Sequence, residues 1–195
     1  MEDSHSCNQT CVTIQRFNHE EEQIINKEII KLCGKGVIEE ANHCTGEYIS
    51  PILTRKKKDG TYRLILNLKS FNEYVQYHHF KMESIQSVLK LVKHKCYMAS
   101  VDLKDAYYSL PIVQEHRKFL RFKFKGKLFQ YTCFPNGLAC CPRLCTKLLK
   151  PAYASLGEKG CEVVPYIDGS YIQGDSELEC WQSAKQTVLL FQDLP

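Results

Sequence analysis

Apolar residues recur along this chain with two spacings, and the spacing changes from one segment to the next. Over residues 20–32 apolar side chains such as Ile25, Ile29 and Leu32 are three to four positions apart, which predicts a helix that Gly34 ends. Residues 61–68 alternate apolar and polar side chains, which predicts a strand with one buried face. Asp59-Gly60 stands just before this strand and after another extended segment, and this dipeptide is a strong signal for a β-hairpin.

The other apolar segments are of the same two kinds. Helical spacing predicts helices over 84–91, with Ser84 as N-cap, over 141–156 and over 180–191. The short extended segments are 37–40, 49–54, 98–103, 116–124, 127–133 and 163–172, the last a pair of strands turning at Asp168-Gly169. Because helices and strands are mixed along the chain, we predict an α+β fold with an antiparallel sheet and helices packed on one face.

Length and composition fit one folded domain. A chain of 195 residues can bury a sizeable core, and its 44% hydrophobic and 25% charged residues are near globular averages. We expect a loose leader over 1–18 and a single domain over 19–195. No signal peptide or long apolar span is visible, so we expect an intracellular protein, cytoplasmic or nuclear, without a membrane partner. The odd count of eleven cysteines favours reduced thiols over a disulfide framework.

The net charge of +4 is modest, but the cations are clustered. One group lies on the hairpin around Asp59-Gly60, and its members are Arg55, Lys56, Lys57, Lys58 and Arg63. A second group follows later in the chain and consists of Arg117, Lys118, Arg121, Lys123, Lys125 and Lys127. Such runs are usually solvated surface, although either group would also suit backbone phosphates.

Two aspartates stand where strands are predicted to end. Asp102 interrupts the apolar run 98–103, where an ionised carboxylate is costly to bury without a partner or a metal. An edge-strand carboxylate that faces water is the alternative. If Asp168 lies beside Asp102, the two carboxylates would repel each other unless a divalent cation lay between them. A pair of Mg²⁺ ions held in this way is suited to nucleotidyl transfer.

Five segments in a fixed order carry a resemblance to a known family. They are KKDGTYR (57–63), LNLKSFN (66–72), SVDLKDAYY (100–108), FPNGL (134–138) with CPRLCTKL (141–148), and YIDG (166–169). In this order they resemble the reverse transcriptases of retroelements, most closely those of retrotransposons related to the DIRS and Ty3 groups. The resemblance implies the fingers and palm of a polymerase, with the thumb absent from this chain.

The resemblance also implies roles for individual residues. Asp102 and Asp168 would be catalytic and would bind Mg²⁺, or Mn²⁺, together with the backbone carbonyl of Leu103. The residues implied in binding the deoxynucleoside triphosphate are Lys57, Lys58, Arg63, Asp105, Ala106, Tyr107 and Gly137. Tyr166 and Ile167 would lie at the primer end. The other implied partner is an RNA or DNA template with its primer. Without the family motif, Tyr107 would be read as a core aromatic residue.

Gly169 departs from the family pattern, which has a second aspartate at this position. Glycine suits a hairpin turn, so we expect the fold to survive, but the site loses a negative charge. Asp175 is expected to be carried away along the strand and not to replace it. The activity implied is RNA-directed DNA polymerisation, impaired by Gly169 and by truncation. The alternatives are a non-catalytic nucleic-acid-binding remnant that holds backbone phosphates with the hairpin cations and the second basic group, and a decayed copy of an element.

Overall fold

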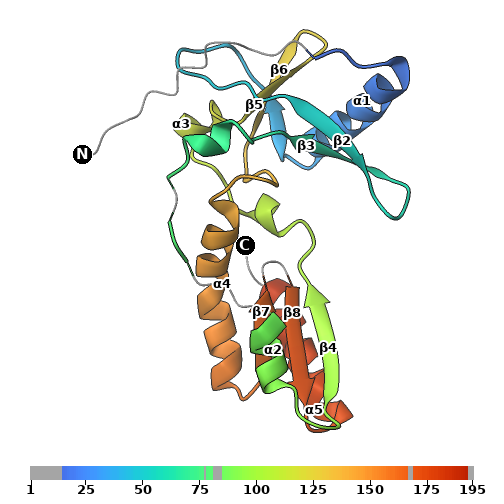
Figure 1. Cartoon of the computed structure of the whole chain (residues 1–195), viewed down its shortest axis with the longest axis vertical. Helices are drawn as coiled ribbons and strands as arrows, with labels where there is room; N and C mark the ends of the chain where they lie inside the picture. Colours follow the sequence, from blue (N-terminus) through green and yellow to red (C-terminus); the bar gives the residue numbers. More distant parts are fainter. Residues whose placement is uncertain (1–14, 77, 81–84, 167–168, 193–195) are drawn as a thin grey trace, which may run out of the picture. The chain divides into compact units, whose positions relative to one another are not determined.

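The chain forms two compact units, shown in Figure 1. The computed structural model describes residues 15–76, 78–80, 85–166 and 169–192. Unit 1 comprises Met1–Tyr77 and Tyr107–Cys141, and unit 2 comprises His78–Ala106 and Pro142–Pro195. The chain therefore leaves unit 1, enters unit 2, and then repeats the same order.

Unit 1 begins with the helix expected from the isoleucine spacing. This helix, α1, spans His19–Gly34 and is closed at its start by a capping box between Asn18 and Glu21. Ile25 and Ile29 lie on its buried face, so the expected helix is confirmed. Residues 1–14 of the expected leader lie outside the described residues. Gln15, near its end, exchanges two hydrogen bonds with the backbone of Ile52, at 2.6 and 2.7 Å.

Two small antiparallel sheets complete unit 1. One has the strand order β1-β6-β5, and the other is the hairpin β2-β3. The bounds are β1 Ile38–Glu40, β2 Ile52–Lys56, β3 Tyr62–Leu66, β5 Arg121–Phe124 and β6 Lys127–Tyr131. Three short helices, η1 Phe71–Glu73, η2 Ala106–Ser109 and α3 Gln114–Arg117, join these elements. The α+β class is confirmed, with the strands divided among several sheets.

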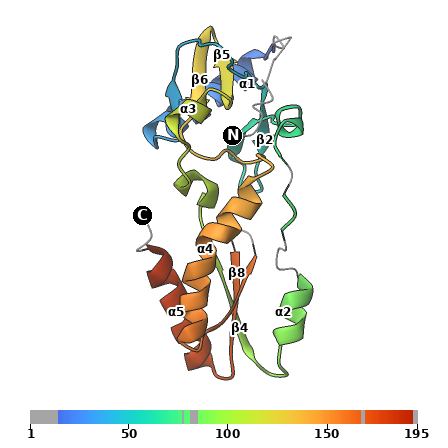
Figure 2. The same ribbon diagram turned by 90° about the vertical axis from the view of Figure 1, so that its left-hand side faces the viewer.

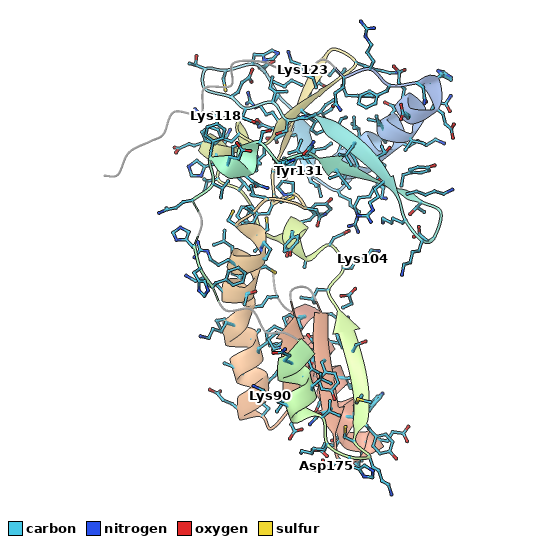
Figure 3. All side chains as sticks on the ribbon, viewed as in Figure 1. Lys90, Lys104, Lys118, Lys123, Tyr131 and Asp175 are labelled. Carbon is cyan, nitrogen blue, oxygen red and sulfur yellow. The ribbon has the colours of Figure 1, made fainter. Side chains whose placement is uncertain are left out.

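The core of unit 1 gathers side chains from both sheets and from α1. Phe122 and Tyr131 are among its fully buried members, and their rings lie 6.2 Å apart. Figure 3 labels Tyr131 within this unit. Burial raises the pKa of the Tyr131 hydroxyl, because the phenolate would have to be desolvated. The packed core gives the β2-β3 hairpin a rigid base.

Unit 2 is built on the antiparallel sheet β4-β8-β7. The strands are β4 Tyr97–Asp102, β7 Glu162–Tyr166 and β8 Gly169–Gly174, and the helices are α2 Ile85–Leu91, α4 Cys141–Glu158 and α5 Glu177–Gln192. Figures 1 and 2 show α5 and α2 on opposite sides of this sheet, so the expectation that the helices pack on one face is wrong for unit 2. A Cβ atom at Gly174 would come within 2.5 Å of the Cys180 backbone nitrogen, so glycine allows α5 to pack closely.

Two expected strands differ from the structure. Residues 98–103 were expected to be buried, but β4 is an edge strand, and Met98 is 62% exposed. A short apolar run does not distinguish a central strand from an edge strand, because that depends on which strands pair beside it. The segment 116–124 was expected to be extended throughout, but α3 occupies its start and β5 begins only at Arg121. Ser84, the expected N-cap of α2, lies outside the described residues.

Candidate functional site

Strand pairing places Asp102 directly opposite the position at which this chain departs from the family pattern. Asp102 is the last residue of β4, and its partner in the antiparallel register is Gly169, the first residue of β8. On its other side, Gly169 pairs with Tyr166, the last residue of β7. Residues directly opposite each other in such a ladder have Cα atoms about 5 Å apart. A carboxylate at position 169 would therefore lie beside that of Asp102.

The carboxylate of Asp102 is exposed, which corrects the expectation that it lies in a buried strand. Side chains alternate in exposure along the second half of β4: those of Ser100 and Asp102 are exposed, and those of Ala99 and Val101 are half-buried. Burial therefore imposes no cost that a metal would have to offset, and the edge-strand alternative holds for this residue. Asp102 forms no ion pair with any described lysine or arginine, so its negative charge is available to a cation in solution.

The other expected catalytic residues are only partly described. Asp168 and Ile167 lie outside the described residues, and for Tyr166 the structure gives the backbone pairing alone. Within the described ranges, no three histidine, cysteine or carboxylate side chains converge in the way a metal centre requires. The assignments of Asp168, Tyr166 and Ile167 therefore stay predictions.

Asp175 lies at the opposite end of the sheet from Asp102. Gly174, which precedes it, pairs with Tyr97 at the start of β4, whereas Asp102 ends that strand. Five steps along a strand amount to roughly 17 Å. In Figure 3, Asp175 and Lys104, which follows β4 closely, are labelled at opposite ends of unit 2. Asp175 also binds Lys93 at 3.3 Å, so the structure agrees that it does not replace the missing aspartate.

The segment after Asp102 changes direction sharply. Leu103 is half-buried, and Asp105 is exposed with a φ of +57°, a backbone conformation that few residues other than glycine adopt. Ala106 begins the short helix η2. Tyr107 is half-buried and packs against the core of unit 1. The structure thus gives Tyr107 at least the packing role that its residue type alone suggests.

The β2-β3 hairpin carries its cations on exposed positions. Its turn is closed by a 2.7 Å hydrogen bond from the Lys57 N–H to the Thr61 carbonyl. Gly60 adopts a φ of +82°, which confirms the turn expected from Asp59-Gly60. Asp59 accepts hydrogen bonds from the backbone and side chain of Thr61, at 2.9 and 2.6 Å, and these bonds lower the pKa of its carboxyl. The Asp59 carboxylate therefore stabilises the conformation of the turn.

The register of the hairpin points to a residue of the first basic group that the family resemblance did not assign to nucleotide binding. Arg55 lies directly opposite Arg63, so both side chains project from the same face. Like charges placed opposite each other in a sheet repel. Among the described residues, no carboxylate pairs with Arg55, Arg63, Lys57 or Lys58. Two opposed guanidinium groups without a counter-ion form a favourable site for a polyanion. Arg55 and Arg63 are the same number of residues from the centre of the turn, and this spacing in the sequence could have predicted that they lie opposite each other.

The turn that contains Gly137 is held by a side chain from another motif. The Asn72 amide donates to the Gly137 carbonyl at 2.9 Å, and its oxygen accepts from the Ala139 N–H at 2.9 Å. Gly137 has a φ of +97°, and no atom lies within 4 Å of an added Cβ, so backbone conformation favours glycine here. Asn72 was part of a quoted segment, but only the structure shows that it positions this turn.

The second basic group is mostly neutralised by carboxylates. Arg117 binds Glu39 at 3.0 Å, and Arg121, which is buried, binds Glu47 at 2.5 Å. The two remaining pairs of this group are Lys125 with Glu22 and Lys127 with Glu40, both at 2.9 Å. Four of the six residues that the alternative interpretation assigns to backbone phosphates therefore already bind carboxylates, and their use for phosphates stays a prediction. No helix in the described part of the chain is long and apolar enough to span a bilayer.

Comparison with known proteins identifies the family to which this chain belongs. Residues 55–191 match the family described as reverse transcriptase (RNA-dependent DNA polymerase), so the chain belongs to the reverse transcriptase family. This confirms the resemblance drawn from the five ordered segments.

Related sequences include retrotransposon polyproteins. The Transposon Tf2-7 and Tf2-3 polyproteins of Schizosaccharomyces pombe are each 28% identical to the chain over 170 residues, which are 85% of this chain and 12% of each polyprotein. The chain thus spans only a small part of these relatives. The finer assignment to the DIRS group stays a prediction.

Solved structures share the fold. The native Prototype Foamy Virus Protease-Reverse Transcriptase matches with a TM-score of 0.76 at 21% identity, over 91% of this chain and 23% of that one. The foamy viral protease-reverse transcriptase in complex with dsDNA matches with a TM-score of 0.74 at 21% identity, over 96% of this chain and 39% of that one. The α+β arrangement of fingers and palm is therefore confirmed.

Proposed function

We propose that this chain is the fingers and palm of a retrotransposon reverse transcriptase, related to the DIRS and Ty3 groups, whose RNA-directed DNA polymerase activity is weakened by Gly169. The substrates would be a primed RNA or DNA template and deoxynucleoside triphosphates. The observation that carries the proposal is the pairing of Asp102 with Gly169, which combines one family carboxylate with the loss of another. Membership of the family supports the type of chemistry.

Asp102, Asp168 and the backbone carbonyl of Leu103 would hold Mg²⁺, or Mn²⁺. All three offer oxygen donors, which these hard cations prefer, and the exposed Asp102 has no competing ion pair among the described residues. Bound there, the metal would stabilise the negative charge that develops on the phosphoryl oxygens. Without a carboxylate at position 169, the site has less negative charge with which to attract two divalent cations.

The hairpin would bind the triphosphate. Arg55 and Arg63 present opposed guanidinium groups, and Lys57 and Lys58 add two more cations near the turn. Arginine suits phosphate because its planar group can donate two parallel hydrogen bonds. The residues proposed around the rest of the nucleotide are Asp105, Ala106, Tyr107 and Gly137, with Tyr166 and Ile167 at the primer end.

Restoring the missing carboxylate tests the proposal. In primer extension on an RNA template with Mg²⁺, we expect Gly169→Asp to raise the rate by about tenfold or more, the equivalent of about 1.4 kcal/mol in the barrier. Adding Asp102→Asn to this variant should abolish the gain. Gly157→Asp is the matched control, because it adds the same charge to unit 2 at a position with open space. Equal rates for Gly169→Asp and Gly157→Asp would refute the proposal.

A nucleic-acid-binding protein without catalysis is the second candidate, and the unpaired cations of the hairpin are the observation that favours it. Its binding to primed template would fall steeply with salt and would not depend on Mg²⁺ or nucleotide. The polymerase proposal instead expects binding to tighten when Mg²⁺ and the matching deoxynucleoside triphosphate are added together. A filter-binding titration with and without these additions distinguishes the two.

A further inference from the structure

Unit 1 contains a cavity that the proposed polymerase function does not use. Its volume is about 780 Å³, which lies within the range of small-molecule sites, roughly 300–1,000 Å³. Three stretches that are distant in sequence form most of its wall, namely residues 15–17, 49–51 and 123–126. The cavity adjoins the base of β2, whereas the cationic turn lies beyond Lys56. The five residues of β2 span roughly 13 Å, so the two features are separate.

One part of the cavity wall is aromatic and apolar. Phe17 and Phe124 both line it, and their ring centroids lie 6.2 Å apart at an interplanar angle of 56°. Ile49 and Pro51 add aliphatic surface. Phe124 is buried and carries the Lys125 ammonium 5.7 Å from its ring centroid, whereas Phe17 is half-buried, so Phe17 is the ring that a flat group of a ligand can pack against.

The rim of the cavity is cationic. Arg16, Lys123 and Lys125 line it, together with one carboxylate, Glu22. Glu22 is already paired with Lys125 at 2.9 Å. Arg16 and Lys123 are exposed, and neither forms an ion pair with another residue in the described ranges. Lys123 is labelled in Figure 3. Two cations therefore remain to attract an anion.

A buried hydroxyl group also lines this cavity. Ser50 is 2% exposed, and its Oγ has no hydrogen-bond partner among the described residues. Its backbone is held in place, because the Ser50 N–H donates to the Arg121 carbonyl at 2.8 Å. A buried hydroxyl without a partner is unfavourable, and a ligand atom that pairs with it removes the penalty.

We propose that this cavity binds a nucleoside monophosphate unit. The planar base would pack against Phe17, and Arg16 and Lys123 would hold the phosphate. Ser50 would hydrogen-bond to a polar atom of the base or the sugar. The same chemistry is offered by a free mononucleotide and by one nucleotide of a single strand, and the experiment distinguishes these sources.

The experiment measures binding to the full chain by isothermal titration calorimetry in EDTA, which removes any contribution from a metal site. The probes are dAMP, deoxyadenosine, inorganic phosphate and a hexadeoxyadenylate strand. We expect saturable binding of dAMP, weakened about tenfold by Lys123→Gln and about threefold by Ser50→Ala. Lys127→Gln is the matched control, because Lys127 lies on the same hairpin and pairs with Glu40 outside the cavity.

Two results would support the proposal with different sources. Tighter binding of dAMP than of the strand indicates a free nucleotide, and tighter binding of the strand indicates a nucleotide within a chain, provided that Lys123→Gln weakens both. The proposal is overturned if neither binds, if phosphate or deoxyadenosine binds as tightly as dAMP, or if Lys127→Gln matches Lys123→Gln. Ser50→Ala removes only an unpartnered hydroxyl, so it should fold normally and keep the test valid.

Discussion

The two basic regions of unit 1 contain similar numbers of cations but differ in what surrounds them. On the β2-β3 hairpin, all five lysines and arginines are exposed, and none pairs with a carboxylate in the part of the chain that the structure describes. Along α3, β5 and β6, four of six cations bind carboxylates contributed by α1, β1 and the segment after β1. The two regions therefore differ in uncompensated positive charge and not in the number of basic residues, so we expect the hairpin to be the stronger site for an anion.

Arg121 and Arg63 represent the extremes of this contrast. Arg121 is 6% exposed and binds Glu47, Gln130 and the Asn42 carbonyl, so its charge stabilises the fold. Arg63 is exposed and faces another arginine across the hairpin. Loss of the first should cost stability, and loss of the second should cost binding.

The largest expected effect is on the stability of unit 1. Arg121→Met leaves the half-buried Glu47 without its arginine, and we expect the free energy of unfolding to fall by about 3 kcal/mol. Chemical denaturation monitored by circular dichroism measures this. Arg121→Met combined with Glu47→Met should lose less, because no charge is then left unpaired. A loss below 1 kcal/mol for the single variant would contradict the role of Arg121 as a buried structural charge.

The next effect concerns binding at the hairpin. Arg63→Gln and Arg55→Gln should each weaken the affinity for a deoxynucleoside triphosphate by about tenfold, because each removes a charged donor to phosphate. Neither should lower stability, since removal of one arginine relieves the repulsion between the two. Titration with fluorescent nucleotide measures the affinity. Lys127→Gln, which removes an exposed but paired lysine, is the control, and an equal loss there would remove the distinction between the regions.

The smallest effect is a change in pH dependence. The hydrogen bond from Gln130 lowers the pKa of Glu39, against the opposing effect of burial and with a further contribution from Arg117. A carboxyl group whose pKa is lower in the folded state stabilises the fold above the unfolded value, near 4.5, and this contribution is lost as pH falls through the folded value.

Thermal melts between pH 6 and pH 3 should therefore show a shallower decline for Glu39→Gln than for the unaltered chain. Glu73→Gln serves as the control, since the carboxylate of Glu73 makes no ion pair within the described ranges. If the two variants decline in parallel, Glu39 makes no such contribution.

Local pattern was enough to predict most elements and the family. The isoleucine spacing predicted α1, and Asp59-Gly60 predicted the β2-β3 turn, because helix periodicity and turn conformation depend on neighbouring residues. The five ordered segments predicted the reverse transcriptase family, and the match over 55–191 confirms it. The short helix α3 was missed, since its four residues show too little periodicity to distinguish a helical turn from a strand.

The sequence by itself was therefore enough to predict the order of most elements and the family, and to show that glycine replaces the family aspartate at position 169. Only the tertiary structure decided that Asp102 is exposed on an edge strand and that Arg55 opposes Arg63. It also decided that four of the six cations in the second basic group bind carboxylates. The carboxylates that neutralise Arg117, Arg121 and Lys127 lie 74 to 87 residues away in the chain. Whether a charge is paired depends on contacts between distant segments, and local sequence pattern does not specify those contacts.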